Sequence, residues 1–328
     1  MNYEIVRNAV YGLAVGDALG VPVEFLYRNQ VRTINIKKME GSDTGFSAKY
    51  TSYWADKVPK GSYSDDTAMV LATMDAYSNE KLKYSDIMEN YIKWIEVGKY
   101  SSMDYPFGVG NCCLRAINNY RKNKDVNKCG CTGFKENGNG ALMRILPTCI
   151  FLLLCDVDDS KKIKILNKTT ALTHAHPISL MADVIYFLFF RELVYGKSKE
   201  EAFDYIINYD YSKYFGNETI DVYKHILNKD FLKIKDIEEK ANGYVVDTLE
   251  GVLFSIMKNK NYKNTVLCSI NLGYDTDTIA AIAGSLAAVL YGFKDIPKSW
   301  IEDLRCKDYI DEMIDKYCKR LHITSKED

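Results

Sequence analysis

The sequence predicts an all-α protein that folds as a single domain over residues 1–328. Along most of the chain apolar residues recur three and four positions apart, which is the period of a helix with one buried face. Alternating segments that would indicate strands are scarce, and the best of them, residues 31–36, is weak. No Pro/Gly/Ser-rich linker divides the sequence, and the length is sufficient for a core of considerable size.

Five predicted helices lie in the first half of the chain, at residues 3–19, 68–77, 84–97, 113–121 and 142–154. The first of them ends where Gly20 is followed by Pro22, because a glycine after the last apolar turn and a proline soon afterwards stop a helix. Residues 29–63 show no periodicity and are expected to form a long surface loop, of a length that usually has a function. A second polar loop is expected at residues 123–137.

The other five predicted helices are residues 163–172, 178–195, 245–257, 279–290 and 309–321. The most apolar run, residues 178–190, contains Asp183 and is followed by Arg191. It is too short to span a bilayer and is therefore predicted to be a buried helix. The helix at 279–290 carries a stripe of small residues that permits close approach of a neighbouring helix. This stripe consists of Ala280, Ala283, Gly284, Ala287 and Ala288.

Composition and charge exclude some classes of binding partner. Hydrophobic residues make up 47% of the chain and the formal net charge is −1, so no excess of charge predicts a nucleic-acid or membrane partner. The N-terminal segment has no basic region followed by a long apolar stretch, and we expect a cytoplasmic protein. The nine scattered cysteines are then expected to be reduced thiols, and Cys129 and Cys131 lack the further ligands that a zinc site requires.

Two short clusters of carboxylates and hydroxyls are the strongest chemical signal. Each stands before an apolar helical run, and they are Ser64, Asp65, Asp66 and Thr67 in one part of the chain and Asp275, Thr276, Asp277 and Thr278 in another. Such side chains are favoured helix N-caps, because their oxygens accept hydrogen bonds from free backbone N–H groups. They are also the ligands that a hard divalent cation prefers. Two such clusters brought together by folding could hold a pair of ions that activate water.

Three further positions are candidates only in combination with these clusters. Glu24 follows the first helix, and alone it would be a solvated loop residue. The stretch Gly138-Asn139-Gly140 precedes a helix and could offer backbone N–H groups to a phosphate, although a plain turn has the same composition. His174 lies near the end of one predicted helix, where a histidine is commonly structural.

The order of these motifs is more specific than any one of them. Along the chain stand GDALGVPVEF, KVPKGSYSDDTAM, FGVGN, GNGALMR, THAHP and GYDTDTIAAIAG. This series resembles the ADP-ribosylglycohydrolase family over residues 6–292. The resemblance implies a compact, all-α orthogonal helix bundle with two Mg²⁺ or Mn²⁺ ions in a cleft. It also implies hydrolysis of the N- or O-glycosidic bond that joins ADP-ribose to an acceptor.

The resemblance further implies roles for individual residues. The implied metal ligands are Ser64, Asp65, Asp66, Asp275, Asp277 and Thr278. The implied catalytic residues are Glu24, which would gate the site or orient the reactive water, and Asp277. The implied ADP-ribose-binding residues are Gly108, Gly110, Asn111, Gly138, Asn139, Gly140 and His174. One position departs from the pattern, since Gly108 stands where some relatives have an Asp with a part in handling the ribose.

The implied substrate is an ADP-ribosylated protein or a small ADP-ribosyl compound, with no requirement for a nucleic acid or a membrane. One alternative is a protein of the same fold that binds ADP-ribose without cleaving it. Another is an all-α, Mg²⁺-dependent diphosphate enzyme such as a terpenoid synthase, but the residues after Asp66 do not supply the third acid of an Asp-Asp-x-x-Asp pattern. The sequence leaves open the acceptor, the choice of ion and the oligomeric state. Residues 29–63 are expected to meet the acceptor.

Overall fold

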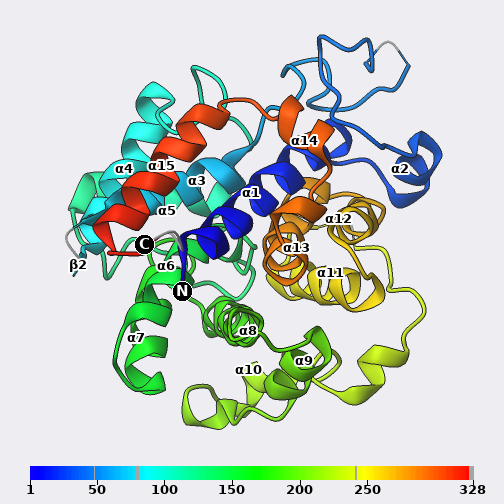
Figure 1. The fold of residues 1–328 in the computed structure, drawn as a ribbon. Helices are drawn as coiled ribbons and strands as arrows, with labels where there is room; N and C mark the ends of the chain where they lie inside the picture. The colour runs from blue at the N-terminus through cyan, green and yellow to red at the C-terminus, as the bar shows by residue number, and fades with distance from the viewer. Residues whose placement is uncertain (48, 79–80, 241, 325–328) are drawn as a thin grey trace.

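The computed structural model describes residues 1–47, 49–78, 81–240 and 242–324, and within them it confirms the all-α prediction (Figure 1). The α-helices are α1 (Tyr3–Gly20), α2 (Arg28–Ile34), α3 (Asp65–Ala76), α4 (Tyr84–Val97), α5 (Asn111–Asn123), α6 (Leu146–Leu154), α7 (Asp159–Thr170), α8 (Pro177–Val194), α9 (Lys199–Ile207), α10 (Asn217–Val222), α11 (Val245–Lys258), α12 (Tyr262–Ile270), α13 (Thr276–Tyr291), α14 (Lys298–Asp303) and α15 (Lys307–Arg320). Short 3-10 helices are η1 (Val21–Val23), η2 (Leu142–Arg144), η3 (Tyr211–Lys213), η4 (Lys229–Lys233) and η5 (Phe293–Asp295). The sheet within the described residues is an antiparallel hairpin of β1 (Tyr77–Ser78) and β2 (Lys81–Leu82).

Helices α1 and α13 lie side by side in the centre of the molecule, although they come from opposite ends of the chain (Figure 1). Their backbones touch because the contact face of α1 has a glycine every four residues, at Gly12, Gly16 and Gly20. A Cβ atom on Gly16 would lie 2.2 Å from the carbonyl oxygen of Ala280, and one on Gly20 would lie 2.4 Å from the Cα atom of Asp277. The predicted stripe of small residues therefore permits close approach, and it places the end of α1 against the start of α13.

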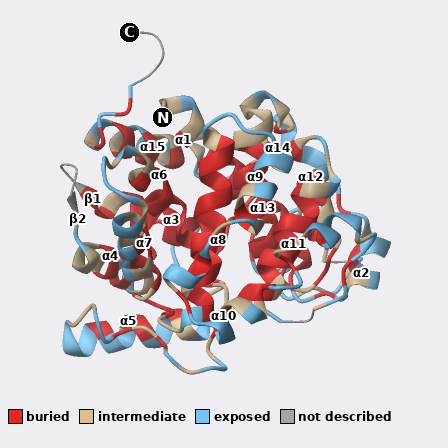
Figure 2. Cartoon of the chain, turned by 90° about the horizontal axis from the view of Figure 1, so that it is seen from below, coloured by how far each residue is buried: buried red, intermediate tan, exposed pale blue. Residues whose placement is uncertain are grey.

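The hydrophobic core is built by helices from the whole chain. Helix α8 is buried over nearly its full length, as predicted for residues 178–190, and it packs against α6, α7, α9, α11 and α13 (Figure 2). Buried hydrophobic residues from Val6 to Ile323 form one large cluster, so both ends of the chain contribute to the same core. No single described helix is long and apolar enough to cross a membrane. Tyr3–Val23 and Arg28–Ile34 reach that length and apolarity only when taken together, and they are bent by 101° relative to each other.

The strand expected at residues 31–36 is wrong. This segment belongs to α2, which ends where Asn35 adopts a left-handed backbone conformation (φ 54°). Within α2 only Val31 is buried, so the helix has no apolar stripe of the kind that reveals a helix in sequence. The loop expected at residues 29–63 therefore contains most of a helix at its start, followed by turns.

The single helix expected at residues 142–154 is also wrong in part, because the segment is divided at Ile145 into η2 and α6. Pro147 occupies the first turn of α6, where its fixed φ and its missing N–H group are tolerated. Helices α9, α10, α12 and α14 are additional to the predicted ones. They are six to nine residues long, which is too short to display a clear helical period.

Candidate active site

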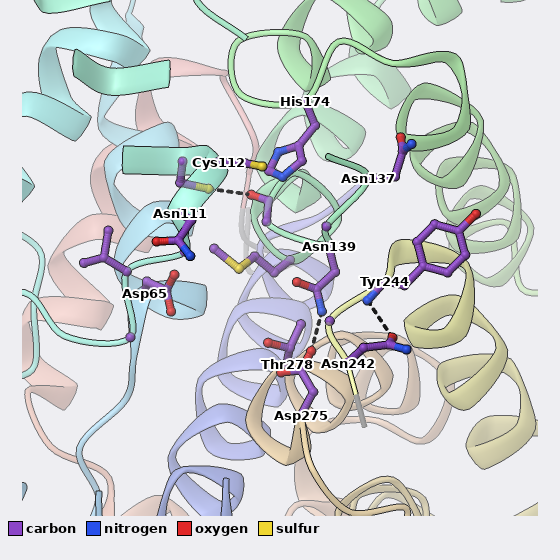
Figure 3. A pocket seen from close by; sticks show the side chains of 18 of the residues that line it. Asp65, Asn111, Cys112, Asn137, Asn139, His174, Asn242, Tyr244, Asp275 and Thr278 are labelled. Carbon is purple, nitrogen blue, oxygen red and sulfur yellow. Dashed lines mark hydrogen bonds between the residues drawn. The ribbon is translucent and has the colours of Figure 1, made fainter. Parts of the chain in front are cut away.

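A cavity of about 760 Å³ opens where several segments meet beside the starts of α5 and α13 (Figure 3). Its walls come from the residues after α1, the turn before α5, the glycine-rich loop at 134–140, the turn at 242–244 and the turn that leads into α13. A volume of this size lies within the usual range of sites for small molecules. Helix ends that are far apart in sequence therefore surround one ligand-sized space.

Most of the residues singled out from the sequence line this cavity. They are Glu24, Asp65, Gly108, Gly110, Asn111, Gly138, Asn139, Gly140, His174, Asp275, Asp277 and Thr278. Ser64 and Asp66 do not line it and are buried. The Oδ2 atom of Asp66 accepts hydrogen bonds from Ser64 Oγ (3.0 Å) and Thr278 Oγ1 (3.3 Å). Folding thus brings the two acid clusters into contact across 212 positions of sequence.

Asp277 belongs to two groups of carboxylates whose oxygens converge. One carboxylate oxygen each from Glu24, Asp275 and Asp277 lie within 4.8 Å of one another. A second set of three oxygens, from Asp17, Asp66 and Asp277, meets the same limit. Asp277 is the residue common to both sets, and its side chain reaches this position because Gly20 lets α13 approach the end of α1.

Asp17 of α1 is fully buried and holds the first acid cluster in place. Its carboxylate accepts hydrogen bonds from the backbone N–H groups of Ser64 (2.9 Å) and Thr67 (3.0 Å) and from Thr67 Oγ1 (2.6 Å). These bonds satisfy donors that the start of α3 leaves free. Burial raises the pKa of Asp17 to about 6, although the same hydrogen bonds oppose the rise. The sequence signal for Asp17 is an acid inside an apolar helix, which requires a polar partner but names none.

Helix capping explains only part of the two clusters. Ser64 is the N-cap of α3 and accepts a hydrogen bond from the N–H of Asp66 (3.3 Å). Asp275 is the N-cap residue of α13, yet its side chain makes no capping bond. Its Oδ2 atom instead accepts a hydrogen bond from Asn139 Nδ2 (2.5 Å). Helix capping therefore explains the presence of Ser64, but it does not explain the carboxylates that line the cavity.

The carboxylates form a buried group of like charges. Within the described part of the chain, none of the six acids at positions 17, 24, 65, 66, 275 and 277 forms an ion pair with Lys, Arg or His. Burial, and then the neighbouring Asp277 and Asp275, raise the pKa of Glu24 well above its usual value. Two oxygens, Glu24 Oε2 and Asp66 Oδ1, are buried without a hydrogen-bond partner. Buried charge is costly unless it is paired or binds a metal, so the residues present fit divalent cations with oxygen ligands.

The glycine-rich loop reaches the acid group through Asn139 (Figure 3). Besides its bond to Asp275, the Asn139 amide donates to Thr248 Oγ1 (2.9 Å), so its orientation is fixed by two acceptors. Gly140 packs closely under His174, since a Cβ atom on Gly140 would lie 3.1 Å from His174 Cε1. The loop therefore connects the acid group on one side of the cavity to the imidazole on the other.

His174 faces this loop as a neutral imidazole. Burial, together with the nearby Arg144, lowers the pKa of His174 to about 3. Arg144 Nη2 donates to Thr173 Oγ1 (2.8 Å), and Thr173 Oγ1 lies 3.0 Å from His174 Nδ1. Because a guanidinium only donates, the Thr173 hydroxyl keeps its own proton to donate to Nδ1. In that arrangement the imidazole proton is on Nε2, the nitrogen nearer to Gly138.

Comparison with known proteins identifies the family. The family model described as ADP-ribosylglycohydrolase matches residues 2–327. This chain belongs to the ADP-ribosylglycohydrolase family. The resemblance in motif order is thus confirmed.

Two relatives illustrate how similar this chain is to known proteins. The ADP-ribosylarginine hydrolase Tri1 of Serratia proteamaculans is 28% identical over 319 residues, which cover 94% of this chain and 78% of the relative. The ADP-ribosyl-dinitrogen reductase glycohydrolase of Rhodospirillum rubrum is 29% identical over 305 residues, which cover 92% and 90%. A solved structure of an ADP-ribosylglycohydrolase-related protein complex has the same fold, with a TM-score of 0.75, 22% identity and coverage of 97% of this chain and 98% of that one.

Gly108 stands where the resemblance implies an Asp in some relatives, and the structure shows what an acid at this position would meet. Its backbone has a φ of 80°, in the left-handed region that favours glycine. A Cβ atom at this position would lie 2.5 Å from Asp65 Oδ1 and 3.3 Å from the Cβ of Ser64. An aspartate in this conformation would press a further carboxylate against Asp65, so the acid group of this chain has no member at position 108.

An aromatic rim that the sequence did not indicate borders the acid group. Phe25 and Tyr274 both line the cavity, and both have positive φ values (66° and 60°), which are uncommon for bulky residues. The Phe25 N–H donates to the Tyr274 carbonyl (2.6 Å). The Phe25 ring makes edge contacts with Tyr53 and Tyr274 and is 42% exposed. Among the described residues of 29–63, none lines the cavity, and Tyr53 reaches its rim through Phe25.

We expect His174 to remain neutral between about pH 5 and pH 9, in contrast to an ordinary histidine. The unfolded chain binds this proton near pH 6.5 and the folded chain only near pH 3. Stability is therefore lost as the pH falls through 6.5, by about 2 kcal/mol at pH 5 for this group alone. Nitrogen-15 NMR of the imidazoles would check the protonation state, with His174→Gln to assign the signal. A His174 signal that titrates near 6.5 would contradict the buried network.

Proposed function

We propose that this protein is a metal-dependent hydrolase that cleaves the glycosidic bond between ADP-ribose and an acceptor, with a modified protein side chain as the acceptor. The observation that carries the proposal is the group of buried carboxylates, without ion pairs among the described residues, beside a ligand-sized cavity. Membership of the ADP-ribosylglycohydrolase family supports ADP-ribose as the substrate class. Relatives named for ADP-ribosylarginine and for ADP-ribosyl-dinitrogen reductase support a protein acceptor.

The proposed cofactor is a pair of divalent cations, Mg²⁺ or Mn²⁺, held between the two acid clusters. The proposed ligands are Asp65, Asp66, Asp275, Asp277 and the hydroxyl of Thr278. Asp277 belongs to both sets of converging oxygens, so it would help to hold a cation at either of them. Ser64 and Asp66 both lie behind the cavity wall, and the Ser64 hydroxyl, 3.0 Å from Asp66 Oδ2, is a further candidate ligand. Such ions, when bound, stabilise developing negative charge and lower the pKa of a coordinated water.

The chain's own residues would bind the substrate, orient the acids and move a proton. Glu24 Oε2 is buried, free of hydrogen bonds and close to Asp277, so it is placed to accept the proton of the attacking water. A general base of this kind typically contributes about 100- to 10,000-fold. Asn139 would keep Asp275 in one orientation through its short hydrogen bond. The Nε2 proton of His174 and the backbone of residues 138–140 would bind ADP-ribose on the opposite wall.

Release of free ADP-ribose from an ADP-ribosylated protein, with and without EDTA, tests this function. We expect turnover to require Mg²⁺ or Mn²⁺ and to fall by at least about 100-fold in EDTA. Without cations, nothing lowers the pKa of the attacking water or neutralises the negative charge of the carboxylates. Substrates linked through arginine and through serine, assayed in parallel, would identify the acceptor. Equal turnover in EDTA would refute the metal mechanism. Binding of ADP-ribose without release from any substrate would favour a protein that only binds.

A further inference from the structure

Two cysteines and an arginine form a separate cluster in the wall of the cavity. Cys112 lies in the first turn of α5 and lines the cavity. Cys131 lies in a segment that pairs with the chain at His174, and its backbone N–H donates to the Thr173 carbonyl (2.9 Å). The Cys131 residue is 8% exposed, whereas Cys112 is only partly buried. The proposed glycosidic chemistry uses neither thiol.

Arg115 brings the two thiols together. Its Nη2 atom lies 3.4 Å from Cys112 Sγ and 3.3 Å from Cys131 Sγ, and an ion pair with Glu136 (2.7 Å) fixes the guanidinium. Cys131 Sγ also lies 3.6 Å from the carbonyl oxygen of Cys112, so both sulfurs lie beside the same guanidinium and the same turn of α5. Cys129, by contrast, donates its thiol to the Leu172 carbonyl (3.2 Å) and has no part in this cluster.

We propose that Cys112 and Cys131 are a redox-sensitive thiol pair that a hydroperoxide converts into a disulfide in the cavity wall. In the first step the Cys112 sulfur attacks one oxygen of hydrogen peroxide, the O–O bond breaks, and Cys112 becomes a sulfenic acid while one water leaves. In the second step the Cys131 sulfur attacks the Cys112 sulfur, the S–S bond forms, and the hydroxyl leaves with the Cys131 proton as a second water. Two electrons pass from the thiols to the peroxide, which is reduced.

The order of the two steps follows from the surroundings of each thiol. Cys112 lines the cavity, so a peroxide can reach its sulfur, and the Arg115 guanidinium lies 3.4 Å from that sulfur. Burial, and then Cys112 itself, raise the pKa of the Cys131 thiol to about 11, so Cys131 is not the thiol that reacts first with the peroxide. The resulting bond would link the start of α5 covalently to the segment beside His174, and a reductant would reverse it.

Peptide mapping of the oxidised full-length protein tests this proposal. The protein is treated with hydrogen peroxide, remaining thiols are blocked with N-ethylmaleimide, and disulfides are located by mass spectrometry. We expect the Cys112–Cys131 cross-link as the main product, and its loss on treatment with dithiothreitol. Cys131→Ser should leave Cys112 as a sulfenic acid that dimedone captures. Arg115→Gln should slow cross-linking by about three- to tenfold, because the cation beside both sulfurs is removed.

Cys306 is the matched control, because it is an exposed thiol that does not line the cavity. Cys306→Ser should form the cross-link at the wild-type rate. If Cys131→Ser fails to fold, Cys112→Ser provides the same test at the more accessible partner, and no cross-link to Cys131 should form in it. Oxidation of Cys306 in the wild-type protein while Cys112 and Cys131 both remain reduced would overturn the proposal.

Discussion

Asp277→Asn is expected to lower turnover by at least about 100-fold while making the cation-free protein more stable. Turnover falls because Asp277 is the one acid in both sets of converging oxygens. Stability rises because burial, and then Asp275, hold the pKa of Asp277 well above its usual value. The folded chain then binds this proton more tightly than the unfolded chain, so the carboxylate destabilises the fold as the pH rises above about 4. Asparagine removes that penalty.

The two effects are measured separately, by release of ADP-ribose with Mg²⁺ and by thermal unfolding in EDTA at about pH 8. Asp308→Asn is the matched control, since Asp308 is also an acid in the first turn of a helix, α15, but is exposed. It should leave turnover unchanged. An active Asp277→Asn protein would remove Asp277 from the reaction, and a lower Tm in EDTA would contradict the charge repulsion inferred from the structure.

Gly16→Ala is expected to destabilise the protein by about 2 kcal/mol in total, since the added methyl group itself should cost about 3 kcal/mol, the upper end for a packed core. The new Cβ atom would lie 2.2 Å from the backbone carbonyl oxygen of Ala280, so α1 and α13 must separate. The better helix propensity of alanine offsets this loss by only about 1 kcal/mol. Separation of these helices also moves Glu24 away from Asp277, and turnover should fall together with stability.

Thermal or denaturant unfolding measures this effect, and Gly110→Ala is its control. Gly110 has a φ of −67° and no atom within 4 Å of the position of a Cβ, so alanine there meets neither strain nor a neighbour. We expect a loss of about 1 kcal/mol or less, because glycine is preferred over alanine at an N-cap. Equal unfolding free energies for the two variants would mean that the contact between α1 and α13 can relax without cost.

The helices could be predicted where an apolar stripe and a local stop signal coincide. The prediction for residues 84–97 has the same bounds as α4, because Gly98 ends that helix in a left-handed conformation. Helix α3, in contrast, begins before the expected residue 68, at Asp65. Its first turn is stabilised by Asp17, which lies on another helix. A contact between distant segments leaves no periodic trace in the local sequence.

The acids of the two clusters could be singled out because carboxylates and hydroxyls stand together before two apolar helices, whereas Asp17 lies inside α1. The shape of the cavity around these acids could not be predicted. Phe25 and Tyr274 have side chains typical of a core, and their place at the cavity depends on two positive φ values and a backbone bond between distant segments. The constraint at Gly108 likewise arises from the approach of Asp65, which only the folded chain brings near.

The close contact between α1 and α13 has a consequence for how the protein is made. Glu24 and Asp277 are about 250 positions apart, and a ribosome that adds about 5–20 residues per second needs roughly 10 to 50 s between them. Throughout that interval the face of α1 that carries Gly12, Gly16 and Gly20 cannot pack, because α13 has not yet been synthesised. A translation product that stops before α13 would therefore lack the second acid cluster, and the buried group of carboxylates would assemble only in the last stage of synthesis.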